Sequence, residues 1–201
     1  MSQLTKKQEQ SLITRQKLVD AAFENFFDVG FENTTLEKIS RDAHVSRGAA
    51  YWHFKNKHDL FRETVLSALE RIKKRKQPIY EDDQQTFKEK AVQMIAIPYN
   101  DNQDYKFLQQ ASQTIEKNPE FEDLKAAIEA TKLKLYHFFL NGIRDLQKAQ
   151  SGTVNGNAAE VATLLFTYFE GMHSTLIPPE VSNCYTPEAI EKSLELIFQH
   201  L

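Results

Sequence analysis

Apolar side chains recur at three- and four-residue spacing along nearly the whole chain of 201 residues. No stretch alternates apolar and polar residues as a half-buried strand would, so β-structure is not expected. The first helical pattern starts near Thr14 and ends at Gly30, where a glycine followed by Phe31 is typical of a helix C-cap. The sequence therefore predicts an all-α fold of about nine helices.

Capping residues and prolines set the expected helix limits. Thr34-Thr35-Leu36-Glu37 has the pattern of a capping box, and Ser46 and Asn56 are suitable N-caps for the third and fourth helices. Pro78 and Pro98 are expected to end the fourth and fifth helices. With Asn118 as the N-cap of the seventh helix, the helices are expected at about residues 14–29, 35–42, 47–53, 57–76, 83–97, 103–117, 119–150, 158–177 and 187–201.

The charge distribution separates the N-terminal part of the chain from the rest. Residues 1–76 hold 15 Lys and Arg against 10 Asp and Glu, whereas residues 77–201 hold 10 against 18. A basic segment in an otherwise acidic chain is typical of a region that meets a polyanion. The single cysteine, Cys184, excludes an intrachain disulfide, and no apolar run approaches the roughly 20 residues of a membrane helix. We therefore expect a cytoplasmic protein without a membrane segment.

Two short helices joined by Ala43-His44-Val45 form a candidate helix-turn-helix motif. Its second helix starts with Arg47-Gly48-Ala49, in which two small residues let the backbone approach base edges and the arginine donates hydrogen bonds. Tyr51, His53 and Lys57 follow at spacings that can track a phosphate backbone. The sequence thus predicts that this helix enters the major groove of double-stranded DNA.

The segment from Thr34 to Phe61 resembles the DNA-binding domain of the tetracycline-repressor (TetR) family. The run Tyr51-Trp52-His53-Phe54-Lys55-Asn56-Lys57 is similar to the corresponding run of the AcrR-like branch, which regulates efflux pumps. The resemblance extends over about residues 14–62. Beyond residue 80 only the general pattern matches, with long helices, a loop near residues 151–156 and two apolar C-terminal helices.

The resemblance implies roles for the matching residues. Trp52 and Phe54 would hold the recognition helix against the first and fourth helices. His44 stands where the family usually has glycine, and histidine is one of the few other residues that tolerate a positive φ. Of the implied DNA contacts, Arg47, Gly48 and Tyr51 would face bases, Thr35, Lys38, Ala49, His53 and Lys57 would touch the DNA backbone, and Ser46 would lie beside them at the helix start.

The C-terminal part carries many aromatic residues within its helices, and such residues belong to a core, a dimer contact or a ligand cavity. Glu170 among aromatic residues would favour a cationic ligand. His137 and His173 are equally compatible with buried core histidines. The candidate ligand-binding residues are Phe107, Tyr136, His137, Phe139, Phe166, Phe169, Glu170 and His173.

The sequence as a whole predicts a helix-turn-helix DNA-binding domain at residues 1–56, a connecting helix at 57–76 and a ligand-binding and dimerisation domain at 77–201. The expected function is a ligand-responsive repressor that binds a palindromic operator as a homodimer. A hydrophobic or cationic small molecule would release it, and it would control a multidrug efflux system. The alternatives are an activator, or a helical small-molecule-binding or interaction protein without DNA binding. No catalytic group, cofactor or metal site is expected.

Overall fold

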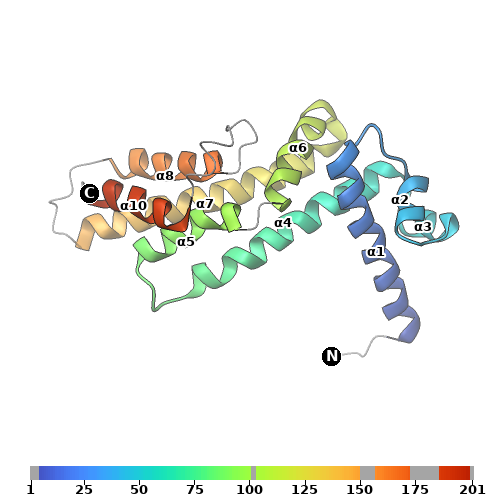
Figure 1. Ribbon diagram of the computed structural model, residues 1–201, viewed down its shortest axis with the longest axis horizontal. Helices are drawn as coiled ribbons and strands as arrows, with labels where there is room; N and C mark the ends of the chain where they lie inside the picture. The colour runs from blue at the N-terminus through green and yellow to red at the C-terminus, as the bar shows by residue number, and fades with distance from the viewer. Residues whose placement is uncertain (1–4, 101–102, 150–156, 173–185, 200–201) are drawn as a thin grey trace. The chain divides into compact units, whose positions relative to one another are not determined.

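The computed structural model of the protein describes residues 5–100, 103–149, 157–172 and 186–199 (Figure 1). Within these ranges it contains nine α-helices, one short 3-10 helix and no strand, which confirms the all-α prediction. The elements are α1 (Lys6–Val29), α2 (Leu36–Asp42), α3 (Arg47–His53), α4 (Lys57–Glu81), α5 (Phe87–Asn100), α6 (Gln103–Lys117), η1 (Pro119–Phe121), α7 (Glu122–Ala149), α8 (Ala158–Met172) and α10 (Pro187–Gln199). None of the described helices is both long and apolar enough to cross a bilayer.

The first helix is longer than its apolar stripe indicates. It begins at Lys6, where Thr5 and Gln8 form a capping box: Gln8 N donates to Thr5 Oγ1 at 3.3 Å and Thr5 N donates to Gln8 Oε1 at 2.8 Å. The predicted start near Thr14 is wrong because the first turns are exposed and polar, so no periodic apolar pattern marks them. The predicted end is confirmed, since Gly30 has a φ of 79° and its N–H donates to Phe26 O at 3.1 Å.

Two prolines do not end their helices as predicted. Pro78 lies inside α4 and Pro98 inside α5, and each is followed by less than one further turn. A proline there removes a single backbone hydrogen bond near the helix end, so the cost is limited. Asn118 is the N-cap as predicted, but of the 3-10 helix η1 that precedes α7, and its side-chain amide donates back to Thr114 O at 2.7 Å and gives no capping bond.

The chain forms two compact units. The first comprises Met1–Glu70 with Phe107–Lys125, and the second comprises Arg71–Lys106 with Ala126–Leu201. The core of the first unit is a cluster of phenylalanine rings in which Phe61 lies 4.9 Å from Phe31 and 5.1 Å from Phe121. These offset and edge-on contacts are favourable beyond simple burial. Residues of α6 and η1 thus complete the core of the unit that carries α1, α2 and α3.

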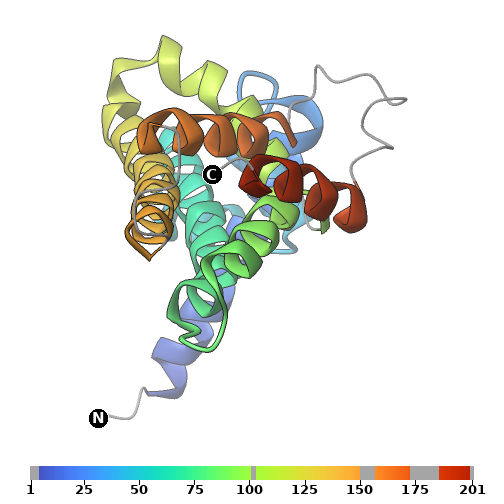
Figure 2. The same cartoon turned by 90° about the vertical axis from the view of Figure 1, so that its left-hand side faces the viewer.

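The second unit is built from α5, α7, α8 and α10 together with the second half of α4. Its α5 packs against both α8 and α10, and Figure 2 shows these helices side by side. The side chains that fill its interior are apolar and fully buried, and they include Met94, Ile95, Leu135, Phe139, Leu165 and Leu194. At Gly142 of α7 the ring of Phe87 of α5 approaches so closely that a Cβ atom would lie 2.0 Å from Phe87 Cδ2.

We predict that Gly142→Ala lowers the stability of the protein by about 1–3 kcal/mol, because Phe87 must move away from the added methyl group. Gly171→Ala in α8 is the matched control, since nothing lies within 4 Å of a Cβ there. An alanine in place of a helical glycine should stabilise the protein by about 0.5–1 kcal/mol. Thermal unfolding followed by circular dichroism checks both, and equal effects of the two substitutions would contradict the close α5–α7 contact.

Candidate nucleic-acid interface

The start of α2 shows why the chain turns at Thr34 and Thr35. Thr35 is the N-cap, and its Oγ1 accepts a hydrogen bond from Lys38 N at 3.1 Å. Thr34 is buried and its hydroxyl donates to Gly30 O at 2.8 Å. The predicted capping box is therefore wrong in its pairing, because Thr34 is not the cap and Glu37 does not return to its backbone.

The turn between α2 and α3 follows the prediction. His44 has a φ of 54°, so this histidine occupies the left-handed conformation that the TetR family usually gives to glycine. Val45 N donates to Ser40 O at 2.9 Å across the turn. Ser46 then caps α3, since its Oγ accepts from Ala49 N at 3.2 Å. Local hydrogen bonds thus fix the place where the recognition helix begins.

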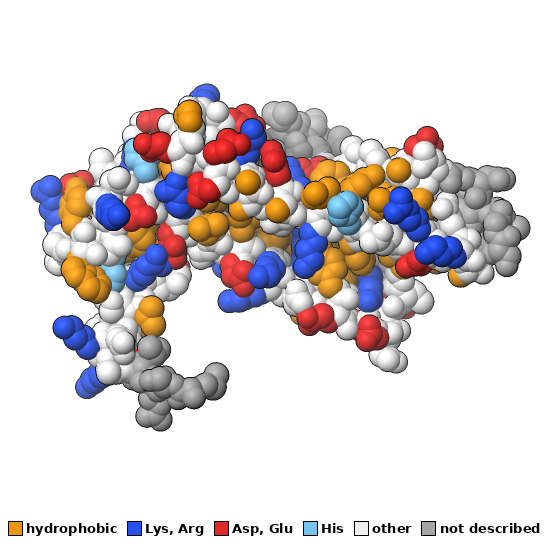
Figure 3. Space-filling view, turned by 180° about the vertical axis from the view of Figure 1, so that it is seen from behind, with side chains coloured by type: hydrophobic (Ala, Val, Ile, Leu, Met, Phe, Trp, Pro, Cys, Tyr) orange, Lys and Arg blue, Asp and Glu red, His pale blue; other side chains and the backbone are white. Residues whose placement is uncertain are grey.

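The helix α3 buries one side and exposes the other. Ala50 and Phe54 are buried, which confirms the structural role predicted for Phe54. Ser46, Arg47, Gly48 and Tyr51 are exposed, and 72% of the Arg47 side chain is accessible. A Cβ on Gly48 would meet nothing within 4 Å. The surface predicted to meet base edges is therefore open within the first unit. Figure 3 shows Lys and Arg side chains exposed on this unit, at the left.

Glu37 of α2 holds two of the predicted base-facing residues. Its Oε1 accepts a hydrogen bond from the Tyr51 hydroxyl at 2.8 Å and lies 3.1 Å from Arg47 Nη2. The hydrogen bond from Tyr51, helped by the backbone and the Arg47 charge, lowers the pKa of the Glu37 carboxyl. The Arg47 guanidinium also lies 5.5 Å from the Tyr51 ring centroid. Sequence reasoning missed this role because Glu37 lies ten positions before Arg47 and fourteen before Tyr51, on another helix, and no local pattern links it to them.

Two predicted phosphate contacts are engaged within the protein. Lys38 Nζ donates to Asn25 Oδ1 and lies 3.2 Å from Asp42 Oδ2. Lys57 Nζ donates to Phe31 O at 2.7 Å, and burial lowers the pKa of this amine. Both lysines thus tie α2 and α4 to the segment around α1, and their contacts with DNA remain predictions.

Trp52 is on the surface and not in the core, so the structural role predicted for it is wrong. Its side chain is 73% exposed. Its ring lies edge-on to His53 with centroids 4.6 Å apart. Burial, followed by the charge of Arg15, lowers the pKa of His53. A large aromatic residue usually indicates a core position, and for this reason the exposure of Trp52 could not be predicted from its residue type.

The candidate ligand-binding residues do not form one group. Phe107 belongs to the core of the first unit, where its ring lies 4.6 Å from that of Phe23. His137 is exposed, so it is not a core histidine. Glu170 accepts a hydrogen bond from Lys132 Nζ at 2.5 Å. His173 lies outside the described residues. The others are in the second unit on α7 and α8, with Phe139 and Phe169 buried and Tyr136 and Phe166 half-buried.

Comparison with known proteins identifies the motif. A family model described as "Bacterial regulatory proteins, tetR family" matches residues 18–64. The HTH-type transcriptional regulator AcrR of Shigella flexneri is 46% identical over 63 residues, which are 31% of this chain and 28% of AcrR. The probable acrEF/envCD operon repressor of Escherichia coli K12 is 47% identical over 57 residues, which are 28% of this chain and 26% of that protein. The matched segments thus span less than a third of either partner.

Two solved structures share the fold over most of the chain. Salmonella enterica GusR superposes with a TM-score of 0.66 at 18% identity and covers 98% of this chain and 100% of its own. FadR from Bacillus subtilis, solved in complex with stearoyl-CoA, has a TM-score of 0.62 at 20% identity and covers 92% of this chain and 98% of its own. At such identities the likeness establishes the fold alone.

Residues 18–64 thus form a helix-turn-helix DNA-binding domain of the kind found in bacterial regulatory proteins, and further helices follow it. This domain is of the TetR family, and its sequence is similar to that of AcrR and of the acrEF/envCD repressor.

We predict that the single tryptophan reports on α3 directly. Because Trp52 is exposed, its emission should lie at long wavelength and acrylamide should quench it. A protonated imidazole beside it quenches indole, and the lowered pKa of His53 places this loss below the usual histidine value of about 6.5. A fluorescence titration between neutral and mildly acidic pH checks this, with His53→Gln as a control that shows no such step. Emission typical of a buried indole would contradict the exposed position.

Proposed function

We propose that this protein is a ligand-responsive transcriptional repressor that binds a palindromic operator as a homodimer. A small hydrophobic or cationic molecule releases it from DNA, and its target is a multidrug efflux system. The observation that carries the proposal is the AcrR-like helix-turn-helix, whose Arg47, Gly48 and Tyr51 form an exposed surface on α3. The proposed activity is DNA binding in the cytoplasm rather than catalysis.

The DNA-binding step follows from the chemistry of this surface. Arg47 can donate two hydrogen bonds to a guanine edge, and Gly48 lets the helix backbone approach the bases. Glu37 orders the side chains of Tyr51 and Arg47 in the free protein, so these side chains lose less conformational entropy when the protein binds DNA. Thr35, at the exposed cap of α2, is placed for a phosphate contact. The predicted contacts of Ser46, Ala49 and His53 complete the interface.

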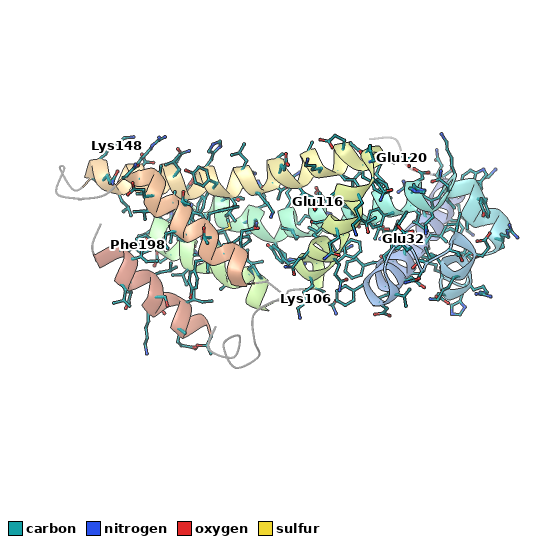
Figure 4. The ribbon with its side chains drawn as sticks, turned by 90° about the horizontal axis from the view of Figure 1, so that it is seen from above. Glu32, Lys106, Glu116, Glu120, Lys148 and Phe198 are labelled. Atoms are coloured by element: carbon teal, nitrogen blue, oxygen red, sulfur yellow. The ribbon has the colours of Figure 1, made fainter. Side chains whose placement is uncertain are left out.

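The homodimer is supported by apolar side chains on the last two described helices. Leu164 of α8 is 53% exposed and Leu196 of α10 is 63% exposed. A groove of about 530 Å³ also lies between α5 and α10, with Phe198 at its wall. Figure 4 labels Phe198 on α10. Exposed leucines on neighbouring helices favour a symmetric contact with a second copy. Two copies can then present their α3 helices to major grooves about 34–36 Å apart.

The regulatory step uses the division into residues 1–56, 57–76 and 77–201 that the sequence predicts. The helix α4 is continuous from Lys57 to Glu81, so the same helix contributes residues to both compact units. A ligand that prefers one position of α4 by a few kcal/mol would shift the dimer away from the DNA-binding arrangement. The E. coli relative is a probable repressor of the acrEF/envCD operon, and this supports an efflux target here.

We predict that Arg47→Ala weakens binding to the operator about 10- to 100-fold, because it removes the contact to base edges. Fluorescence anisotropy with a labelled duplex from the region upstream of the gene measures the affinity over a range of salt concentrations. Lys148→Ala in α7 is the control, since it removes the same charge from an exposed side chain of the second unit. Binding of the wild type no tighter than to a random duplex, or full binding by Arg47→Ala, would refute the proposal.

We predict that Leu196→Glu converts the protein to a monomer, because a charge replaces an apolar group that the second copy covers. Analytical ultracentrifugation should give half the wild-type mass. Leu133→Glu in α7 serves as the control, since Leu133 is exposed to a similar degree, 54%, and lies outside the proposed contact. A monomeric wild type, or a dimeric Leu196→Glu variant, would show that α10 does not form the interface.

A further inference from the structure

A lysine of α4 lies inside the second unit. Lys76 is only 4% exposed, although it is the last residue of the basic run at residues 73–76. Its Nζ lies 4.6 Å from the ring centroid of Phe169 and 5.7 Å from that of Tyr105. The amine therefore faces aromatic rings from α6 and α8 within one unit.

The Lys76 amine lacks the partners that a buried charge needs. In the part of the chain that the structure describes, no protein atom accepts a hydrogen bond from its Nζ. Aromatic faces attract a cation, but they do not replace the three acceptors that an ammonium has in water. Burying most of a lysine with no hydrogen-bond acceptor for its amine is costly, so Lys76 indicates a site that another molecule completes.

The surrounding charges do not satisfy Lys76 either. Glu170, Arg75 and Lys134 are the charged groups that act on it, and two of the three are positive. The one carboxylate, Glu170, already accepts a hydrogen bond from Lys132 Nζ at 2.5 Å. Burial lowers the pKa of Lys76 to about 8, so most of the amine is still protonated at pH 7. The position thus keeps a positive charge that can attract an anion.

We propose that Lys76 anchors the acidic group of an apolar organic anion, whose hydrophobic body packs against the rings of Phe169 and Tyr105. The acidic oxygens would supply the missing acceptors, and the rings would bury the rest of the ligand. If this anion is the effector that releases DNA, the inference rests on the proposed function. It competes with the cationic effector that Glu170 suggests in the sequence, because Lys132 holds that carboxylate.

Two probes with one skeleton test the charge preference. 8-Anilinonaphthalene-1-sulfonate carries a sulfonate, N-phenyl-1-naphthylamine lacks it, and both fluoresce when they enter an apolar site. The wild type should bind the sulfonate probe saturably and more tightly than the neutral one. Lys76→Met should weaken sulfonate binding about tenfold or more, the size of one charge-assisted hydrogen bond, and leave the neutral probe unchanged. Lys74→Met, an exposed position on the same helix, is the matched control and should change neither.

The melting temperature separates a binding role from a structural one. Methionine keeps the length of Lys76 and removes a buried charge, so the ligand-free Lys76→Met variant should melt at the wild-type temperature or above it. A lower melting temperature with unchanged probe selectivity would make Lys76 a structural residue and overturn the inference. Equal binding of the two probes by the wild type, or no saturable binding of the sulfonate probe, would also overturn it.

Measurements on the same samples distinguish a failure of the anion site from a failure of the proposed repressor function. Anisotropy of the operator duplex is measured with and without the sulfonate probe. Probe binding that depends on Lys76, in a protein that binds no DNA, would refute the repressor and leave the anion site standing. DNA binding by a protein that does not prefer the sulfonate probe would leave the repressor standing and refute the anion site. Release of DNA by the probe from the wild type, but not from Lys76→Met, supports both.

Discussion

The rest of the candidate interface depends on the burial of Ala50 and Phe54 beneath α3. A helix of seven residues has little stability of its own, so its position must come from packing. Because these two side chains are buried, the opposite side of the helix presents Arg47, Gly48 and Tyr51 to solvent. The backbone conformation of His44 sets the direction in which the helix leaves the turn. The burial of one face of α3 thus determines which side chains its opposite face exposes to solvent.

Charged residues of the motif serve the protein as well as its proposed ligand. Lys38 donates a hydrogen bond to Asn25 of α1 and Lys57 donates one to Phe31 O just after α1. Glu37 accepts a hydrogen bond from Tyr51 and forms an ion pair with Arg47. The excess of basic residues in the N-terminal part therefore indicates a positive electrostatic potential around the unit, and it does not show which of these residues contact DNA. Specificity rests on the few side chains that are both exposed and held in place.

The two proposed activities, DNA binding and ligand binding, are connected through the single helix α4. The helix α4 begins with Lys57, whose amine binds backbone oxygens of the first unit, and it later carries Lys76 into the interior of the second. It continues through Pro78, against the prediction, because a proline in the last turn costs one hydrogen bond. A ligand that binds Lys76 would therefore act on the same helix that supports the DNA-binding motif.

Local features could be predicted from the sequence because they depend on a few neighbouring residues. The all-α class, the end of α1 at Gly30, the turn at His44 and the cap at Ser46 all follow from spacing and backbone preference. Only the tertiary structure decided the pairing of Glu37 with Arg47 and Tyr51, the exposure of Trp52, the burial of Lys76 and the place of Phe107 in the first unit. Each of these depends on residues from other helices, and a helical period does not show which face of a helix meets which neighbour.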